Sequence, residues 1–272
     1  MAKTIFITGA SRGLGKLWAE AFLKRGDNVV ATARNIDALS ELKKEFGDKV
    51  LPLELDITNK TADYEAIEKA KDHFGKIDVL INNAGYGLFG TVEETSEQQA
   101  REQMETNFFG LLWLTQAVLP IMREQKSGHI LQVSSGLGLF AWEILGLYAA
   151  SKFAVEGLSE SLAREVKDFG ISVTLIEPNS FGTDWAGTSA IQTEKMPEYD
   201  KLRENFFSGL TEDSVGVPEA TVDAILKLVD SEESPLRLIL GKVAYPTVKE
   251  IYQQRLAEWE DWKEVSIAAH GK

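Results

Sequence analysis

The chain has 272 residues and a formal net charge of −13 at pH 7, which disfavours nucleic acid and anionic membranes as partners. It contains no cysteine, which excludes disulfides, thiolate nucleophiles and cysteine-ligated zinc. No apolar run is long enough to span a membrane, and the first apolar run is too short for a signal peptide, so we expect a soluble, cytoplasmic protein with no membrane partner.

No proline-rich or serine-rich linker interrupts the sequence, so we expect a single domain over residues 1–272. The three histidines, His73, His129 and His270, lie too far apart for a local metal motif. We expect them at the surface or at strand edges, and we expect no metal site.

The N-terminal segment has the pattern of a strand, a glycine turn and a helix. Residues 3–8 form a short β-rich run, the sequence TGASRGLG follows, and residues 14–25 are amphipathic. Gly9, Gly13 and Gly15 allow a sharp turn and a close approach of the backbone to a ligand. The helix after them would offer free N–H groups and its positive dipole end to a pyrophosphate, so the segment predicts a dinucleotide site.

The end of the second strand, residues 28–33, indicates which dinucleotide is bound. A site for a 2′-hydroxyl usually has Asp or Glu there, whereas this strand ends in Ala33 and is followed by Arg34. Arg34 and Arg12 could both bind a 2′-phosphate, which therefore fits this site better than a 2′-hydroxyl. We predict NADP(H) in preference to NAD(H). The alternative is that both arginines are solvated surface residues.

Strands and helices alternate through the first half of the chain. Residues 50–55 predict a strand that ends at Asp56 and Ile57, residues 61–74 a helix, and residues 76–82 a strand that runs into Asn83, Ala84 and Gly85. Alternation of this kind implies right-handed crossovers and an α/β fold: one doubly wound parallel sheet with helices on both faces, Rossmann-like.

The second half carries the residues best suited to chemistry. Residues 128–133 predict a buried strand that ends at Ser134 and Ser135, and strand ends are where ligands bind in open α/β sheets. Tyr148 and Lys152 are four apart at the start of a helical pattern, so they share one face. A lysine cation would lower the pKa of the phenol and make it useful in proton transfer. The alternative is a half-buried structural tyrosine.

Together these motifs resemble the short-chain dehydrogenases/reductases of ordinary length. The resemblance runs from residue 3 to about residue 183, and more loosely to residue 240. It includes TGASRGLG, Asp56, NNAG, the Asn107-Phe-Phe-Gly segment, Ser135 thirteen residues before Tyr148, Tyr-Ala-Ala-Ser-Lys, and a later Pro-x-x-x-x-Thr.

The resemblance implies a role for each matching residue. Tyr148 would be the general acid in carbonyl reduction, and Ser135 would hydrogen-bond the same oxygen. Lys152 would hold the nicotinamide ribose. Asn107 would continue a proton relay through water. Without the resemblance, Asn107 would be an ordinary amide in a helix that begins with a capping box at Ser96 and Gln99. The cofactor would lie against Gly9, Ser11, Arg12, Gly13, Leu14, Gly15, Arg34, Asp56, Ile57, Asn83, Ala84, Gly85, Tyr148, Lys152, Pro178, Phe181 and Thr183.

The substrate pocket is predicted from two kinds of residue: those that differ from the family's pattern and those that lie between or after its motifs in the sequence. The family usually has Pro-Gly where this chain has Pro178-Asn179. Residues 184–214 mix aromatic, charged and glycine residues, which favours a mobile lid over the site. The predicted pocket comprises Leu137, Trp142, Leu145, Asn179 and Trp185, and favours a hydrophobic or aromatic ketone or its secondary alcohol. The alternative is that these side chains belong to the core or to subunit contacts.

The C-terminal part predicts a helix over residues 218–229, a last strand over residues 236–240 and a helical tail over residues 243–265. We expect Trp259 and Trp262 of this tail to pack on the body of the protein or on a neighbouring subunit. Family members commonly associate through the helices that begin near Ser96 and Tyr148, so we expect a homodimer or homotetramer.

Three classes of function remain. An NADP-dependent ketone or alcohol oxidoreductase with a small-molecule substrate is favoured because the Asn-Ser-Tyr-Lys set is complete. A 3-oxoacyl-carrier-protein reductase shares that set, but its acidic carrier fits a chain of charge −13 poorly unless a local basic patch exists. A non-catalytic NADP-binding sensor or scaffold would be expected to have lost one of the four residues.

Overall fold

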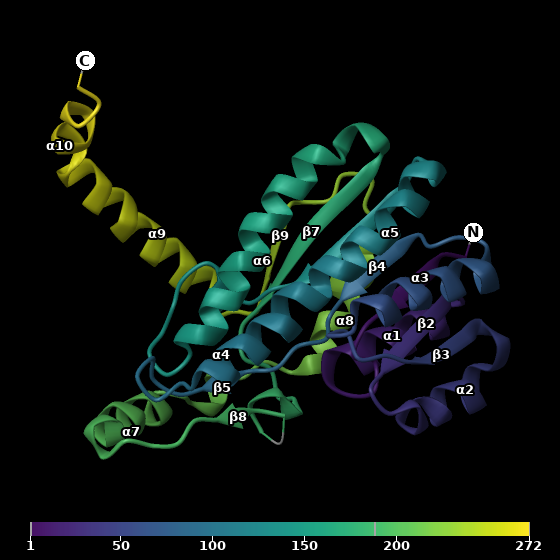
Figure 1. Ribbon diagram of the computed structural model, residues 1–272, viewed down its shortest axis with the longest axis horizontal. Coiled ribbons are helices and arrows are strands. Elements are labelled where there is room, and N and C mark those ends of the chain that lie inside the picture. The colour runs from purple at the N-terminus through teal and green to yellow at the C-terminus, as the bar shows by residue number, and fades with distance from the viewer. Residues whose placement is uncertain (1, 188, 272) are drawn as a thin grey trace.

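The computed structural model describes residues 2–187 and 189–271. Its centre is a sheet of seven parallel strands in the order β3-β2-β1-β4-β6-β7-β9 (Figure 1). The strands are β1 (Thr4–Ile7), β2 (Asn28–Ala33), β3 (Val50–Glu54), β4 (Val79–Asn82), β6 (Gly128–Val133), β7 (Ile171–Pro178) and β9 (Arg237–Leu240). The predicted Rossmann-like α/β fold is confirmed.

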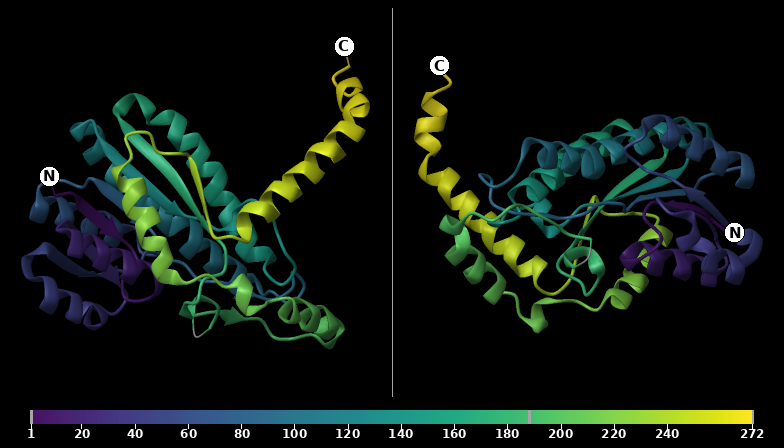
Figure 2. Two further views of the ribbon diagram at one scale, coloured as in Figure 1. Left: turned by 180° about the vertical axis from the view of Figure 1, so that it is seen from behind. Right: turned by 60° about the horizontal axis from the view of Figure 1, so that its bottom comes forward.

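Helices cover both faces of this sheet and enclose two apolar cores (Figures 1 and 2). One core joins the sheet to α1 (Gly13–Arg25), α2 (Ser40–Phe46) and α8 (Thr221–Asp230). The other joins it to α3 (Lys60–Phe74), α5 (Leu111–Gln125) and α6 (Gly146–Glu165). β1 shows why both faces need cover: Ile5 and Ile7 enter the first core and Phe6 the second, because successive strand residues point to opposite faces.

The strand order places a reversal between β1 and β4. The chain passes from β1 outward to β2 and β3, then returns to β4 on the other side of β1 and continues to β6 and β7. The connections after β1 and β4 therefore diverge at the carboxyl ends of these strands. That divergence leaves a crevice for a ligand.

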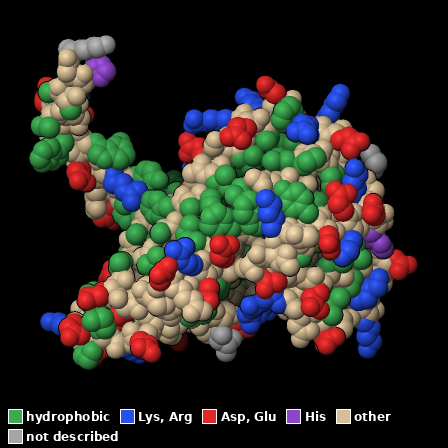
Figure 3. Space-filling view, in the orientation of Figure 1, with side chains coloured by type: hydrophobic (Ala, Val, Ile, Leu, Met, Phe, Trp, Pro, Cys, Tyr) green, Lys and Arg blue, Asp and Glu red, His purple; other side chains and the backbone are tan. Residues whose placement is uncertain are grey.

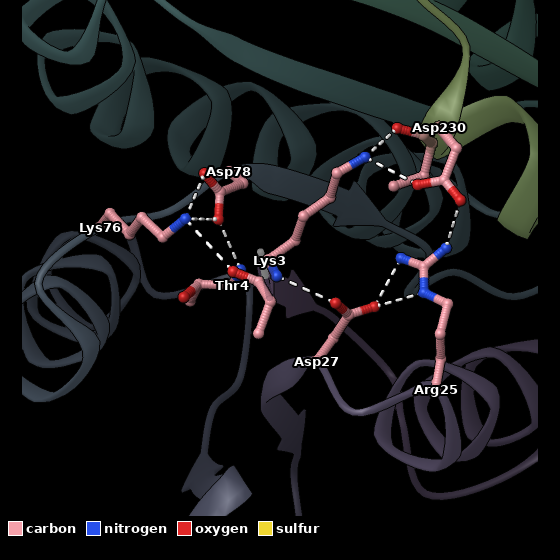
Figure 4. Close-up of polar contacts among 9 residues, drawn as sticks. Lys3, Thr4, Arg25, Asp27, Lys76, Asp78 and Asp230 are labelled. Atoms are coloured by element: carbon pink, nitrogen blue, oxygen red, sulfur yellow. Dashed lines mark hydrogen bonds and ion pairs between the residues drawn. The ribbon is translucent and has the colours of Figure 1, made fainter.

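Ion pairs join several segments at the opposite end of the sheet, where the strands begin (Figure 4). The Lys3 backbone N–H donates to Asp27 at 2.9 Å, and the Lys3 ammonium lies 2.9 Å from Asp230 at the end of α8. Arg25 at the end of α1 pairs with both carboxylates, at 2.5 Å and 2.9 Å. The amino end of β1, the α1–β2 turn and α8 are thus joined at the end of the sheet opposite the crevice between β1 and β4.

Residues 184–214 form a structured cap, here called the lid. It contains β8 (Ile191–Gln192), which pairs in parallel with the short β5 (Leu88–Phe89), and α7 (Asp200–Ser208). Between β5 and α5 the chain forms α4 (Glu97–Met104), whose predicted Ser96–Gln99 capping box is present.

The C-terminal helices α9 (Ala244–Asp261) and α10 (Lys263–Ala268) form an arm that projects away from the body (Figures 1 and 2). Trp259 and Trp262 are more than half exposed, so they do not pack on the body of the protein, and the other expected packing, on a neighbouring subunit, stays a prediction. The arm contacts the body through the first two thirds of α9, as far as Arg255, whose guanidinium donates to the Leu139 carbonyl at 2.7 Å. Within the described residues no helix combines the length and apolarity needed to span a bilayer.

His129 also differs from expectation. It is buried on the central strand β6, where its Nε2 lies 2.9 Å from the Thr174 hydroxyl. Burial lowers its pKa to about 4, and the Lys3 cation adds to the effect. His129 is therefore a neutral structural residue rather than a surface or edge residue.

Candidate active site

A cavity of about 600 Å³ opens where β1, β2, β4, β6 and β7 end. Nearly all residues predicted for cofactor, catalysis and substrate line it. They are Gly9, Ser11, Arg12, Gly13, Leu14, Arg34, Asp56, Ile57, Asn83, Ala84, Gly85, Ser135, Leu137, Trp142, Leu145, Tyr148, Lys152, Pro178, Asn179, Phe181, Thr183 and Trp185. Gly15 and Asn107 lie behind the cavity wall.

The glycine turn has the backbone geometry that a phosphate cradle needs. Gly9 and Gly13 adopt φ of +66° and +56°, which side chains of other residues rarely tolerate. Arg12 caps α1 with extended backbone and makes no side-chain cap bond, so the first N–H groups of the helix are free for a ligand. A Cβ on Gly15 would lie 2.4 Å from the Gly9 carbonyl oxygen, so only glycine lets α1 approach the turn.

Asn83 holds this cradle in place. Its Nδ2 donates to the carbonyls of Thr8 and Gly9 at 2.9 Å and 3.2 Å, and its backbone N–H donates to the Thr8 hydroxyl at 2.9 Å. The side-chain amide is therefore committed to the turn between β1 and α1. Asn83 shapes the cofactor site, a role that sequence alone did not indicate.

The 2′ end of the cavity carries positive charge. Arg12 and Arg34 are exposed, and among the described residues neither guanidinium has a hydrogen-bond or ion-pair partner. β2 ends in Ala33, with no carboxylate to compete for them. Asp56 uses one carboxylate oxygen to accept from the N–H and hydroxyl of Thr58, at 3.0 Å and 2.8 Å, and the other oxygen remains available.

Tyr148 and Lys152 are buried side by side in the first turns of α6. The Lys152 Nζ lies 5.7 Å from the centre of the Tyr148 ring and donates to the Val133 carbonyl at 2.8 Å. Ser135 follows β6, where its hydroxyl accepts from the Leu137 N–H at 3.1 Å, and it acts to lower the pKa of the Tyr148 phenol. The predicted phenol, ammonium and hydroxyl thus meet at one wall of the cavity.

Burial decides the charge states of this pair. It raises the pKa of the Tyr148 phenol, and the Ser135 hydroxyl acts in the opposite direction. Burial also lowers the pKa of Lys152 to about 8, opposed by the negative charge of Glu156. The lowered Tyr148 pKa expected from the Tyr-Lys spacing is not found in the protein alone, because the loss of solvation outweighs a cation that bonds to a carbonyl.

Asn107 is held differently from the expected helix amide. It lies in a π-helical segment, Glu105–Gly110, between α4 and α5. Its Nδ2 donates to the Tyr86 carbonyl and the Ser151 hydroxyl at 3.1 Å each, and its Oδ1 accepts from the Tyr86 N–H at 3.1 Å. The widened turn and these bonds fix Asn107 behind Gly85 and Lys152. Its part in a proton relay through water stays a prediction.

The substrate side of the cavity is apolar. The Trp185 ring stands against Tyr148 with centroids 4.8 Å apart, and against Phe89 with centroids 5.7 Å apart. Phe206, an aromatic residue of the segment predicted to form the lid, lines this side as well. Sequence reasoning missed further lining residues: Phe89, Phe140, Ile191, Leu210, Val243, Ala244 and Thr247. The last three belong to the start of the arm, and no local motif marks them as pocket residues.

Asn179 fastens the lid. Its Nδ2 donates to the carbonyls of Ser180 and Ser214 at 2.7 Å and 3.3 Å, which ties the end of β7 to the end of the lid. Its Oδ1 occupies the place of a Gly241 Cβ, so glycine at 241, with φ of +109°, is needed beside it. Asn179 lines the cavity as predicted, but most of its bonding serves the backbone.

A buried ion pair anchors the lid at its other side. The Arg203 guanidinium of α7 pairs with the fully buried Glu94 carboxylate. Glu94 also accepts from the backbone N–H groups of Met196 and Thr91, at 2.7 Å and 2.9 Å. Although burial acts to raise it, these bonds hold the pKa of Glu94 at about 2. The lid is thus fixed at both ends, and its mobility stays a prediction.

Comparison with known proteins fits this geometry. The family model for short chain dehydrogenase matches residues 3–194. The chain belongs to the short-chain dehydrogenase family. Within the described residues, no group of three or more His, Cys, Asp or Glu side chains is arranged to hold a metal ion.

Several curated relatives of this short-chain dehydrogenase cover most of its length. Oxidoreductase BOA17 of Botryotinia fuckeliana is 40% identical over 99% of this chain and 100% of the relative. The 3-ketodihydrosphingosine reductase of Bacteroides thetaiotaomicron is 38% identical over 87% of each chain. Human retinol dehydrogenase 8 is 33% identical over 86% of this chain and 80% of the relative.

Solved structures agree with the fold. A short-chain dehydrogenase from Streptomyces avermitilis superposes with a TM-score of 0.91 at 35% identity and covers 98% of both chains. One from Burkholderia cenocepacia in complex with NADP has a TM-score of 0.76 at 28% identity, over 96% of this chain and 97% of the other. One from Burkholderia phymatum in complex with NAD has a TM-score of 0.81 at 23% identity, over 95% and 94%, and supports the fold alone. A nicotinamide cofactor is thus supported, with both forms among the neighbours.

The glycine cradle gives a direct prediction. We expect Gly15→Ala to weaken binding of NADPH about tenfold or more, because the new methyl must push α1 away from Gly9 and Asn83. Isothermal titration of the folded variant measures this. Gly157→Ala is the matched control, since that helix position has nothing within 4 Å of an added Cβ and should bind normally. If the two variants bound NADPH with equal affinity, the claim that the glycine turn binds the cofactor would be wrong.

Proposed function

We propose that this protein is an NADP(H)-dependent oxidoreductase that reduces a hydrophobic or aromatic ketone, or oxidises the matching secondary alcohol. The observation that carries the proposal is the buried Tyr148 beside Lys152, at the wall of a cavity that is polar toward the glycine turn and apolar toward the lid. When bound, the nicotinamide would supply or accept the hydride. The side chains of the protein would position the substrate and transfer the proton.

Tyr148 is suited to act as the proton donor in reduction. Its raised pKa keeps the phenol protonated at neutral pH, which is the state a general acid needs. Ser135 lines the same cavity, so a carbonyl oxygen placed between its hydroxyl and the phenol would receive two hydrogen bonds. For oxidation the phenol must first lose its proton, which requires the positive charge of Lys152 to remain in place.

The residues at the 2′ end fit a phosphate. The free guanidinium groups of Arg12 and Arg34 stand where β2 lacks the carboxylate that a 2′-hydroxyl would require. Two charge-assisted hydrogen-bond donors favour a dianionic 2′-phosphate. These residues support NADP(H) over NAD(H).

The apolar half of the cavity supports the substrate class. Aromatic side chains from four separate segments, Phe89, Phe140, Trp185 and Phe206, enclose the space beyond Tyr148. Burial of a large apolar group there would stabilise the complex by about 25 cal/mol per Å². Relatives named for sphingoid and retinoid substrates are consistent with such a ligand, and a sugar or polyol would leave its hydroxyls unpaired.

A homodimer or homotetramer is part of the proposal. Hydrophobic side chains gather over α5 and α6 and along the arm, including Phe153, Leu256, Trp259 and Trp262 (Figure 3). Large exposed apolar side chains that lie this close together are typical of a protein–protein interface. A second copy of the same chain is the simplest partner for such a surface, because most soluble oligomers are homo-oligomers.

The catalytic assignment predicts that Tyr148→Phe lowers kcat for ketone reduction by about 100-fold to 10,000-fold, because the donor proton is removed while the ring remains. Steady-state rates at the reduced-nicotinamide absorbance band, with a panel of aryl and alkyl ketones, measure this. Affinity for NADPH should change little. Full turnover by Tyr148→Phe would rule out the assignment.

The cofactor assignment predicts that Arg12→Ala with Arg34→Ala raises the KM for NADPH about tenfold or more and leaves the KM for NADH nearly unchanged. Initial rates with each cofactor measure the ratio. Arg101→Ala, which removes an exposed guanidinium from α4, serves as control. A wild type that prefers NADH would show that the two arginines only face solvent.

The oligomer is tested by light scattering coupled to size-exclusion chromatography. We expect the mass of a dimer or tetramer for the wild type, and a smaller mass for Trp259→Glu with Trp262→Glu, because buried charge disfavours an apolar contact. Tyr64→Glu, a similar exchange at a partly exposed ring on α3, is the control. A monomeric wild type would contradict this part of the proposal.

A further inference from the structure

A cluster of charged side chains lies next to Lys152 on α6 and on the strands below it. The proposed reaction does not assign a role to this cluster. Glu156 stands one helical turn after Lys152 on α6, and Glu177 stands on β7. Both are buried, with 5% and 0% exposure. Buried carboxylates are costly unless they are paired, so two of them together beside a catalytic lysine require an explanation.

One guanidinium serves this cluster. The Nε of Arg237, on β9, lies 3.0 Å from Glu156 Oε2 and 3.5 Å from Glu177 Oε1. Its Nη2 lies 2.9 Å from Glu160, which is partly exposed one turn further along α6. Two buried carboxyls that share one cation cannot both ionise without strong repulsion.

Burial raises the pKa of Glu177 to about 8, the charge of Glu156 adds to this effect, and Arg237 opposes it only in part. Glu177 is therefore protonated near neutral pH, and among the described residues neither of its oxygens has a hydrogen-bond partner. Arg237 thus pairs most closely with Glu156 and Glu160, at 3.0 Å and 2.9 Å.

Glu156 also contacts the segment that carries Ser135. A Cβ on Gly138 would lie 3.0 Å from Glu156 Oε1 and 2.5 Å from the Ser134 hydroxyl, so the carboxylate packs under this turn. Lys152 bonds to Val133 at the start of the same turn. The Glu156 carboxylate and the Lys152 ammonium thus lie against one short stretch of backbone, residues 133–138.

We propose that Glu156 is a positioning residue that keeps Lys152 in its charged form, and that its ion pair with Arg237 fixes the carboxylate for this task. The inference rests on the proposed function, because it assigns the proton chemistry of the same site. The groups that face Lys152 are Tyr148 and Glu156 on α6, with Glu177 and Arg237 behind them on β7 and β9. Without the Glu156 charge, burial acts on Lys152 unopposed.

The test is the pH profile of kcat/KM in Glu156→Gln, which keeps the shape and the bond to Arg237 but removes the charge. Loss of an anion lowers the pKa of every group near it, so the whole profile should move toward acid, by about one pH unit. Glu156→Asp should restore most of the wild-type position. A loss of activity without a shift of the profile would indicate a merely structural role and overturn the proposal.

Glu160→Gln is the matched control. It removes another carboxylate that pairs with Arg237, one turn further from Lys152 and partly in solvent. Its profile should stay at the wild-type position. A shift as large as that of Glu156→Gln would show that Arg237, rather than the Glu156 charge, sets the profile, and would overturn the proposal.

A second readout does not depend on turnover. The Cε resonance of Lys152 in ¹³C-lysine-labelled protein, identified by its loss in Lys152→Arg, reports the pKa of the ammonium with and without NADPH. It should titrate at lower pH in Glu156→Gln than in wild type or Glu160→Gln. An unchanged titration would overturn the inference. If no carbonyl is turned over, the proposed function fails while this titration still decides the role of Glu156.

Discussion

The parallel sheet is the constraint on which the rest of this structure depends. Because every strand runs in the same direction, the side chains that follow β1, β2, β4, β6 and β7 all meet at one edge. Gly9, Arg34 and Ser135 lie far apart in sequence but line one cavity for this reason. At the opposite end of the strands, the ion pairs of Lys3 with Asp230 and of Arg25 with Asp27 join the start of β1, the α1–β2 turn and α8.

Burial is the second determinant, since it sets the charge of each group in the site. Tyr148 is kept protonated, while Lys152 is moved toward neutrality and depends on a nearby anion to remain a cation. The same surroundings that protect the reacting carbonyl from water therefore require support for the ammonium. The Glu156, Glu177 and Arg237 cluster, which begins one helical turn after Lys152 on α6, supplies that support.

The sequence predicted much of the fold and most of the site, because both depend on local patterns. The strand-glycine-helix unit and the Tyr148–Lys152 spacing involve residues close in sequence, and periodicity reveals them. Contacts between distant segments were not predictable in this way. Asn179 bonds to Ser214, and the arm lines the pocket at Ala244, yet neither pairing leaves a signal in local sequence.

Two errors have the same physical origin. The spacing of Tyr148 and Lys152 predicted a lowered phenol pKa, but spacing carries no information about burial, which here dominates. The aromatic residues of the tail suggested packing on the body or on a neighbouring subunit, and only the first of these is contradicted, because an amphipathic pattern does not say which surface covers it. In both cases the residue types were read correctly and their surroundings were not.

The central claim is that Tyr148 is a buried, protonated acid that serves carbonyl reduction. The most direct measurement is the pH dependence of kcat/KM in both directions for one hydrophobic ketone and its alcohol. The account predicts a reduction rate that stays level through neutral pH, and an oxidation rate that rises with pH as the phenol loses its proton. An oxidation rate that is independent of pH, or greatest in acid, would contradict it.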